Sequence, residues 1–374
     1  MCCVEILVMA TVADRVLAVL GAKRAARRDQ VAKQRSTPHA CKLNLNIISL
    51  PDLALTSSIT PPAQIGSAPI SLARVRTLFG RPDRIAQSDF LRREIAARMF
   101  ERLELIRVAP NAIIDAGCGG GSDFAVLHQR FPAARLIGID GSLAMIGEAA
   151  SRQLRTRSTM SRLLARLLPN RADSGALADA LLLCGDYARL PLPPTSAGLL
   201  WSNLALHWHP RPDEVFVEWR RILCDEGLLM FSCFGPDTFR ELRRVCAPAC
   251  PPQVLPFVDM HDLGDMLVDA GFATPVMDME MLTLTYDTVD KMLADVRALG
   301  GNPLAPRPPG LVGRTARTTL YQALEGGRNA EGKLSLSIEV IYGHAFRPVA
   351  RTTSRGESIV RFTPRNEAGN SKAN

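Results

Sequence analysis

The sequence lacks the patterns that mark membrane-spanning, disulfide-linked and zinc-binding proteins. No stretch reaches the ~18 apolar residues that a membrane-spanning helix needs. Nine cysteines are scattered through 374 residues without any C-x-x-C pair. Cys246 and Cys250 lie close together, but no second pair follows at zinc spacing. We therefore expect a cytoplasmic protein with reduced thiols, no metal site and no membrane span.

Aromatic residues are scarce, at 5% of the chain, and positive charge is only mildly in excess. The net charge is +8, of which residues 1–60 contribute +4 through eight Lys/Arg against four Asp/Glu. The rest of the chain lacks the concentrated basic stripe and the aromatic-rich motif of nucleic-acid-binding domains. We expect no nucleic-acid partner.

A glycine-rich turn between Ile113 and Gly121 is the most informative pattern that is present. Two apolar residues and an acid lead into it, in the order I-I-D-A-G-C-G-G-G. The residues before it are typical of a buried strand, and residues 122–131 are typical of a helix. Glycines at such a turn let the backbone approach a ligand closely. A second apolar strand ends at Asp140, where Rossmann-like sites hold a ribose.

The turn departs from the dinucleotide-binding fingerprint. G-x-G-x-x-G requires a third glycine, and that position holds Ser122. The pattern therefore argues against an NAD-dependent reductase. The form D-x-G-C-G-x-G, which starts at Asp115, resembles instead the first motif of class I S-adenosylmethionine (SAM) methyltransferases.

This resemblance implies SAM as the cofactor and a set of residues that bind it. In that family the first acid and the glycine backbone meet the methionine part, and the second acid binds the ribose hydroxyls. Met145 is expected on the adenine face or in the core. The string G-D-x-x-x-L-P from Gly185 resembles the segment whose acid meets the adenine amino group, although that acid could also cap a turn. The implied cofactor-binding residues are Asp115, Gly117, Cys118, Gly119, Gly121, Asp140, Gly141, Met145, Asp186, Tyr187, Ser202 and Asn203.

Strand and helix patterns alternate after residue 110, which predicts the fold. Five apolar strands separated by helices imply a parallel sheet covered on both faces. Two later stretches are expected to complete a seven-stranded, mostly parallel, Rossmann-like α/β sheet. Helical periodicity runs through Leu72–Ile106, where Pro82 is expected to separate two helices, and returns at Thr288–Leu299. The predicted strands are Ala112–Asp115, Leu136–Asp140, Ala180–Cys184, Gly198–Trp201, Gly227–Cys233, Glu280–Tyr286 and Leu334–Tyr342.

One folded domain is expected between two disordered ends. Residues 1–70 combine an interrupted apolar start, a basic run and a Ser/Thr/Pro-rich linker, which is typical of a disordered extension. The methyltransferase domain is expected over 71–347, and a polar, arginine-bearing tail over 348–374. Within the domain, 236–333 is expected to form a partly helical region that covers the substrate.

An arginine-rich insertion is predicted at 151–178. Six arginines fall between Ala150 and Ala180, where a helix-to-strand connection needs only a few residues. Two interpretations stay open: a solvated basic loop, and a docking surface for an acidic partner.

The fourth predicted strand leads into W-S-N-L-A-L-H-W (201–208), which narrows the resemblance. Ligands bind at the carboxyl ends of parallel strands, so Ser202 and Asn203 are expected beside the methionine part of SAM. With E-W-R-R-I-L (218–223) and F-G-P-D-T-F-R-E-L (234–242), the segment resembles the malonyl-acyl-carrier-protein O-methyltransferases of biotin synthesis. A sister group shares F-G-P-D-T: the methyltransferase-like assembly factor of respiratory complex I, associated with arginine hydroxylation, which stays open as the alternative.

The resemblance implies methylation of the free carboxylate of a malonyl thioester on an acidic acyl-carrier protein. A carboxylate is ionised at neutral pH and needs no general base, which agrees with the absence of a Ser/His/Asp triad. A cation that orients the carboxylate is expected, with Arg84, Arg347 and Arg211 as candidates and surface solvation as the competing interpretation. Asn203 and His207 are further catalytic candidates, although a structural hydrogen bond is the competing interpretation for His207.

Overall fold

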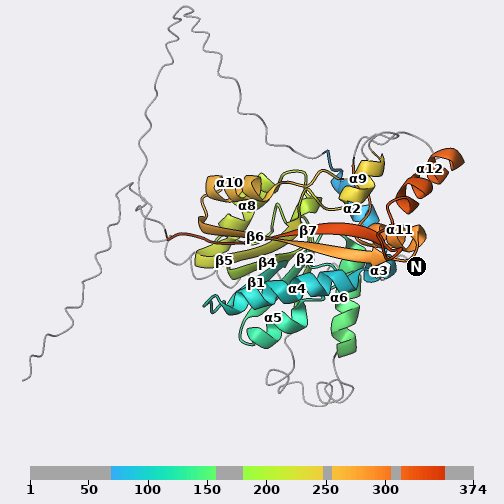
Figure 1. Cartoon of the computed structure of the whole chain (residues 1–374). Coiled ribbons are helices and arrows are strands. Elements are labelled where there is room, and N and C mark those ends of the chain that lie inside the picture. Colours follow the sequence, from blue (N-terminus) through green and yellow to red (C-terminus); the bar gives the residue numbers. More distant parts are fainter. Residues whose placement is uncertain (1–68, 157–179, 247–254, 305–312, 350–374) are drawn as a thin grey trace, which may run out of the picture. The chain divides into compact units, whose positions relative to one another are not determined.

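A seven-stranded sheet organises the part of the chain that the structure describes (Figure 1). The computed structural model describes residues 69–156, 180–246, 255–304 and 313–349. The strand order is β3-β2-β1-β4-β5-β7-β6, with β1 to β5 parallel and β7 antiparallel to both of its neighbours. The predicted α/β sheet is confirmed. Its strands are β1 (Ala112–Ala116), β2 (Arg135–Asp140), β3 (Leu181–Cys184), β4 (Ala197–Asn203), β5 (Leu223–Phe234), β6 (Ala273–Tyr286) and β7 (Leu334–Phe346).

Helices connect the strands and cover both faces of the sheet. In chain order they are α2 (Leu72–Leu78), α3 (Pro82–Ala86), α4 (Asp89–Glu104), α5 (Phe124–Arg130), α6 (Leu143–Thr156), the 3-10 turn η2 (Leu206–Trp208), α8 (Pro212–Ile222), α9 (Arg240–Cys246), α10 (Met260–Asp269), α11 (Val289–Ala298) and α12 (Arg314–Glu325). Figure 1 shows α4 and α5 on one face of the sheet and α8 and α10 on the other.

Alternate residues of the central strands point into two separate cores. Ile113 and Leu199 pack in a core with residues of α4 and α5. Their chain neighbours Ile114 and Leu200 pack in a second core with residues of α8 and α10. Successive side chains of a strand point to opposite faces, so continuous apolar runs are needed where both faces are covered. This two-sided burial is why the central strands could be recognised from the sequence.

The first helical segment forms three helices, so the prediction of two is wrong. α3 begins at Pro82 as predicted, but a second break separates it from α4. Ser88 lies at that break, and its buried hydroxyl bonds to the main-chain oxygens of Ile85 at 3.0 Å and Ala298 at 2.9 Å. A serine hydroxyl that bonds to the backbone competes with helix continuation.

The second half of the domain differs from the predicted elements in one strand. β6 begins at Ala273, earlier than the predicted Glu280. Its residues alternate between half-buried and exposed and form no apolar run, so the sequence does not mark the start of this strand. The predicted region 236–333 holds α9 to α12 as well as this strand. Residues 1–68, most of the predicted insertion over 151–178 and the tail from 350 lie outside the described residues, and 151–156 form the end of α6. In the described residues, no helix is long and apolar enough to span a membrane.

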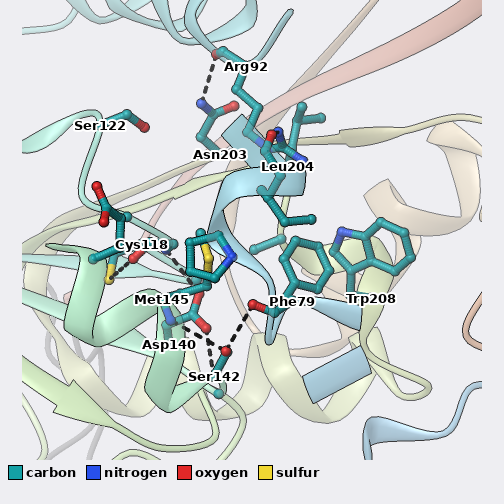
Figure 2. A pocket seen from close by; sticks show the side chains of 18 of the residues that line it. Phe79, Arg92, Cys118, Ser122, Asp140, Ser142, Met145, Asn203, Leu204 and Trp208 are labelled. Carbon is teal, nitrogen blue, oxygen red and sulfur yellow. Dashed lines mark hydrogen bonds between the residues drawn. The ribbon is translucent and has the colours of Figure 1, made fainter. Parts of the chain in front are cut away.

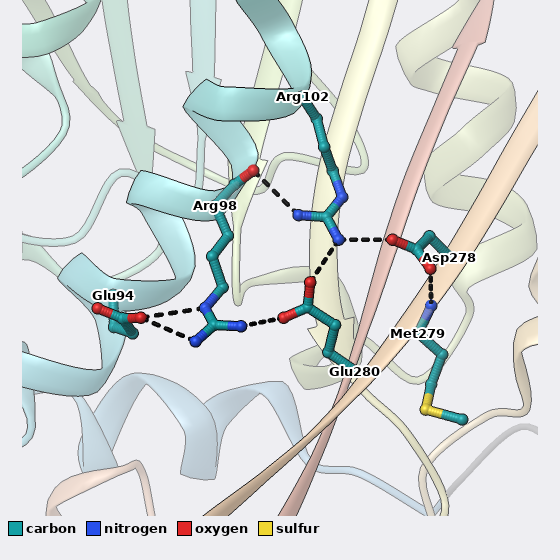
Figure 3. Close-up of polar contacts among 6 residues, drawn as sticks. All are labelled: Glu94, Arg98, Arg102, Asp278, Met279 and Glu280. Carbon is teal, nitrogen blue, oxygen red and sulfur yellow. Dashed lines mark hydrogen bonds and ion pairs between the residues drawn. The ribbon is translucent and has the colours of Figure 1, made fainter.

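Two arginines of α4 connect this helix to the edge strand β6 (Figure 3). Arg98 donates a hydrogen bond to Glu280, and Arg102 donates to the same carboxylate at 2.7 Å and to Asp278. The guanidinium of Arg102 also lies 4.0 Å from the ring centre of Tyr342. Burial opposes the ionised form of Glu280, but the hydrogen bonds from Arg102 and Arg98 lower its pKa below the ordinary value. Glu280 is thus the shared acceptor that holds α4 against the sheet edge.

We predict that Glu280→Gln lowers the free energy of unfolding by about 1–3 kcal/mol, because two guanidinium groups lose a charged acceptor. The melting temperature should fall by about 2–8 °C, measured by calorimetry at neutral pH. Because the pKa of Glu280 is lowered in the folded protein, this stabilisation is present above the unfolded glutamate pKa and is lost as pH falls through the folded value.

The matched control is Glu94→Gln, which removes the other acceptor of Arg98 within α4, where the carboxylate is 56% exposed. An exposed pair on one helix contributes only about 0.3–0.5 kcal/mol. Equal losses in the two variants would show that the link between α4 and β6 adds nothing to stability.

Candidate active site

A pocket lies at the carboxyl edge of β1, β2 and β4 (Figure 2). The turn after β1 and the residues that follow β2, β3 and β4 form one side, and α2, α3 and the start of α4 form the other. Open α/β sheets bind ligands at this edge. The predicted cofactor-binding residues that line the pocket are Asp115, Gly117, Cys118, Gly119, Asp140, Gly141, Met145, Asp186, Tyr187 and Asn203.

The turn after β1 requires glycine at two pocket positions. Gly117 and Gly119 have φ angles of 81° and 52°, in the left-handed region that favours glycine. A Cβ on Gly117 would lie 2.2 Å from the Cβ of Ala205, so no larger residue fits. The amides of Gly117 and Cys118 donate to the Ile139 carbonyl at 2.8 and 3.0 Å, which fixes the turn against β2. The pocket is therefore bounded here by bare backbone.

Gly121 and Ser202 do not line the pocket, although both are predicted to contact the cofactor. A Cβ on Gly121 would lie 2.5 Å from the ring of Phe124, so this glycine permits the close entry into α5. Ser202 is fully buried, and its hydroxyl donates to the carbonyl of Ala116 at 2.8 Å. These two residues shape the turn and the strand behind the pocket wall.

Asp140 stands at the carboxyl end of β2 with both carboxylate oxygens held by backbone amides. Gly119 donates to Oδ2 at 2.9 Å, and Ser142 donates to Oδ1 at 2.8 Å. Burial raises the pKa of Asp140, while these two hydrogen bonds act in the opposite direction. A carboxylate has about four acceptor sites, so each oxygen can accept a further hydrogen bond from a hydroxyl group. This arrangement suits a ribose diol.

Asp115, Asp123 and Asp140 place three carboxyl groups at the same edge of the sheet; the first two are buried and the third is half-buried. Burial raises the pKa of Asp115 well above its ordinary value, and the charges of Asp123 and Asp140 raise it further. The pKa of Asp123 is also raised by burial, although Trp201 Nε1 donates to it at 2.8 Å and Asn203 Nδ2 at 3.3 Å. Neighbouring negative charges are costly in a buried site, and a cationic ligand offsets that cost. This group of carboxylates therefore fits SAM, which carries a positively charged sulfonium and an ammonium group.

Asp123 is absent from the sequence-based set of site residues. It lies two residues after the glycine turn, where an aspartate at the start of a helix is expected to cap it. Its side chain makes no capping hydrogen bond and instead turns inward to Trp201. Only the packing of α5 against β4 reveals this orientation.

Cys118 and Tyr187 line the pocket as neutral groups. Burial raises the pKa of the Cys118 thiol, and the charges of Asp115 and Asp140 raise it further. Burial also raises the pKa of Tyr187, whose hydroxyl donates to the carbonyl of Ala205 at 2.9 Å. Neither side chain is poised to ionise and act as a nucleophile.

Met145 and Asp186 lie on the side of the pocket that follows β2 and β3. The terminal methyl of Met145 lies 3.4 Å from the point that a Cβ on Gly119 would occupy, so it faces the glycine turn. Asp186 Oδ1 accepts from the amide of Ala188 at 2.9 Å, which is a turn-capping contact. Both residues are in place to meet an adenine ring, and that contact stays a prediction.

Asn203 lines the pocket at the end of β4, but the protein already holds its amide. Nδ2 donates to the main-chain oxygen of Arg92 at 3.1 Å, and Oδ1 accepts from the Ser232 hydroxyl at 2.9 Å (Figure 2). These bonds join β4 and β5 to the first turns of α4. We therefore assign Asn203 a positioning role.

The three arginines predicted to orient the acceptor do not line the pocket. Arg84 donates to the main-chain oxygen of Leu78 beside the pocket wall. Arg347 donates to the carbonyl of Leu223, at the amino edge of the parallel strands and therefore across the sheet from the pocket. Arg211 is exposed and pairs with two acids in the first turn of α8. Each guanidinium is thus held by a local partner, and these assignments are corrected.

His207 also lies outside the pocket lining. Its Nδ1 accepts from the amide of Phe234 at 3.3 Å, and its ring packs against Phe234 and Phe257 beside a smaller hollow. Burial lowers the pKa of His207 to about 3, and the charge of Arg92 acts in the same direction. A group with so low a pKa is a weak base, so the structural interpretation replaces the catalytic one.

Arg92 lines the end of the pocket opposite Asp140 in Figure 2, and no sequence motif marks it. Arg76 and Arg152 also line the pocket, and Arg152 lies 3.6 Å from Asp89. Its Nη1 donates to the Ile85 carbonyl at 3.0 Å and to Ser88 Oγ at 2.5 Å, and its Nη2 donates to the Ala298 carbonyl at 3.3 Å. A guanidinium has five N–H donors, so two remain available in the part of the chain that the structure describes. Asp89 is 3.8 Å away.

Burial lowers the pKa of Arg92 to about 10, against the opposing effect of Asp89. The side chain is therefore still charged at neutral pH. Its three close partners are neutral oxygens, and its one carboxylate neighbour lies at the limit of an ion pair. Such a buried, incompletely paired cation favours an anionic ligand.

The comparisons with known proteins agree with this site. A family model described as a methyltransferase domain matches residues 114–231, which span β1 to β5. A malonyl-[acyl-carrier protein] O-methyltransferase from Laribacter hongkongensis is 41% identical over 301 residues, which is 78% of this chain and 96% of the relative. Proteins of the same name from Gallionella capsiferriformans and Nitrosospira multiformis are each 42% identical, over 73% and 76% of this chain and 90% and 92% of their own. The chain is therefore a SAM-dependent methyltransferase and belongs to the malonyl-[acyl-carrier protein] O-methyltransferase family.

Proposed function

We propose that this enzyme transfers a methyl group from SAM to the free carboxylate of a malonyl thioester on an acyl-carrier protein, in the cytoplasm and for biotin synthesis. The names of the relatives support this substrate, since the alignments cover nearly the whole length of each relative. The observation that carries the proposal is the guanidinium of Arg92, a buried cation inside the pocket with N–H donors to spare.

Arg92 orients the carboxylate of the acceptor. A guanidinium presents its donors in a planar fork that matches the two oxygens of a carboxylate. Methylation removes the negative charge of the acceptor, so the neutral ester binds Arg92 more weakly than the substrate does. Arg92 therefore favours the free acid over its ester and helps the product to leave.

The reaction needs alignment more than acid–base catalysis. When bound, SAM supplies an electrophilic methyl group on a positively charged sulfur. A carboxylate is already ionised at neutral pH, so no residue has to remove a proton. Holding two reactants in the correct orientation contributes about 7–11 kcal/mol to such a reaction. His209 lines the pocket, but its Nδ1 is already bonded to the backbone of Arg211, and the reaction does not require it as a base.

Aromatic rings form one wall of the pocket and give it an apolar side. Phe79 and Trp208 meet edge to face, with ring centres 5.3 Å apart. A Cβ on Gly300 would lie 2.4 Å from the Trp208 ring, so the chain before β7 packs tightly behind it. The Ser142 hydroxyl donates to the Phe79 carbonyl at 3.1 Å, which joins α2 to the residue that binds Asp140. An apolar wall lowers the local dielectric and so strengthens the charge interactions beside it.

We predict that Asp140→Asn weakens SAM binding about 10- to 100-fold, because hydrogen bonds to a charged acceptor contribute about 1.5–3 kcal/mol. Isothermal titration calorimetry measures the affinity directly. The control is Asp265→Asn, which alters an exposed acid of α10 and should keep the wild-type affinity. Unchanged affinity in Asp140→Asn would remove Asp140 from the ribose site.

We predict that SAM affinity falls as pH falls, by up to about tenfold per pH unit for each proton involved. The pKa of Asp115 is raised in the free protein, so the carboxyl group retains a proton at pH values where ordinary aspartates are ionised. A cationic ligand favours ionisation and expels that proton, so the affinity is lost as pH falls through the raised pKa.

The test is calorimetry in two buffers with different heats of ionisation, from about pH 5 to pH 8. The heat of binding should depend on the buffer in the wild type and lose most of that dependence in Asp115→Asn. A constant dissociation constant across this range, with no proton release, would contradict the charge argument.

We predict that Arg92→Gln lowers kcat/KM for a malonyl thioester about 10- to 100-fold and leaves the Kd for SAM nearly unchanged. Arg92→Lys keeps the charge but loses the fork, so it should retain part of the activity. The control is Arg93→Gln: this neighbour on α4 is exposed and donates only to a main-chain oxygen. If Arg92→Gln weakened SAM binding and spared the KM of the thioester, the guanidinium would hold the cofactor carboxylate instead.

A further inference from the structure

The segment between Ser71 and Ser88 carries four arginines and only one acid, Asp83. We call the arginines the basic rim; they are Arg74, Arg76, Arg81 and Arg84 on α2, α3 and their connection. In the described residues, none of the four forms an ion pair with a carboxylate, whereas most other arginines of α4, α8 and α9 do. This surface therefore retains an uncompensated positive charge.

The rim arginines have neutral partners or no recorded hydrogen-bond partner. Arg74 and Arg84 donate to the main-chain oxygens of Leu304 and Leu78. Arg76 and Arg81 are exposed, and within the described residues neither guanidinium forms a hydrogen bond. Burial lowers the pKa of Arg84, and the charge of Arg81 lowers it further, so these two cations lie close enough to repel each other. An approaching anion relieves that repulsion.

The rim adjoins the active-site pocket. Arg76 is both exposed and part of the pocket lining, so it stands where the pocket meets solvent. Its side chain comes within 3.7 Å of the point that a Cβ on Gly141 would occupy, directly after Asp140. Arg81 precedes Pro82 and Asp83, which also line the pocket. A macromolecule seated on α2 and α3 can therefore deliver a tethered substrate into the pocket.

We propose that the basic rim is the docking surface for the acidic carrier protein that presents the acyl thioester. This inference rests on the proposed function. Clustered positive charge at the mouth of a site raises the association rate of an acidic partner and loses that effect in salt. The predicted docking role of the arginine-rich insertion falls on residues that lie mostly outside the described ones.

The test uses Arg81→Glu in the full-length enzyme, because Arg81 belongs to the rim and does not line the pocket. Methyl transfer is measured with malonyl-carrier protein and with malonyl-N-acetylcysteamine, a small thioester that lacks the acidic carrier protein. We expect KM for the carrier substrate to rise about three- to tenfold at low ionic strength. The increase should shrink at about 0.5 M salt, where exposed charges are screened. KM for the small thioester should not change.

The matched control is Arg107→Glu, the same charge reversal on an exposed residue between α4 and β1, at the amino edge of the sheet away from the pocket. It should leave both KM values unchanged. If KM for the carrier substrate rose equally in both variants, the effect would come from the net charge of the enzyme and the docking assignment would fail. A rise for both substrates in Arg81→Glu, or no rise for either, would overturn the docking assignment.

A second measurement separates docking from the proposed reaction. The double variant Arg76→Gln/Arg81→Gln is titrated with carrier protein by calorimetry, with SAM affinity measured in parallel. We expect weaker carrier binding and a smaller salt dependence than in the wild type. If the wild type binds carrier protein but methylates neither malonyl substrate, the proposed function fails while docking stands. If the double variant binds carrier protein as the wild type does, docking on the rim fails.

Discussion

The carboxyl groups of Asp115, Asp123 and Asp140 are held together at one edge of the parallel sheet, the first two buried and the third half-buried. The parallel neighbours β1 and β2 carry the first and third near their carboxyl ends, and the start of α5 adds the second. Burial and mutual repulsion raise the pKa of Asp115, so the free pocket carries an electrostatic cost. A positively charged cofactor removes part of that cost. The same charges also keep the thiol of Cys118 protonated and unreactive.

The opposite end of the pocket carries the opposite sign of charge. Arg92 belongs to α4, and its guanidinium is held by main-chain oxygens from α3 and from the end of α11. The same helix is fixed to the sheet edge through Arg98, Arg102 and Glu280. One rigid helix therefore connects a structural ion-pair network to a cation in the pocket. This arrangement separates the binding of a cationic methyl donor from the binding of an anionic acceptor.

Charge thus contributes to each proposed step: docking of the carrier protein, binding of the acceptor carboxylate and binding of SAM. The basic rim attracts an acidic protein, the guanidinium of Arg92 selects a carboxylate, and the aspartates at the sheet edge favour the sulfonium. The three sets lie on different elements and differ in burial. Salt should therefore weaken docking strongly and affect the buried contacts little.

Local patterns in the sequence determined the seven strands, the glycine turn and the acid that ends β2. These features depend on neighbouring residues: two-sided burial needs continuous apolar runs, and a left-handed turn needs glycine at Gly117 and Gly119. They also carried the resemblance to the methyltransferase family. The first part of β6, before Glu280, and the break at Ser88 escaped prediction, because no apolar run or proline marks them.

Tertiary structure alone decided which charged residues face the pocket. Arg84, Arg211 and Arg347 are bonded to nearby groups outside it, whereas Arg92 is brought in by contacts with Ala298, more than 200 residues away in the chain. Asp123 turns inward to accept hydrogen bonds from Trp201 and Asn203 of β4. The direction of a long polar side chain depends on the partners that folding places around it, and those partners are distant in sequence.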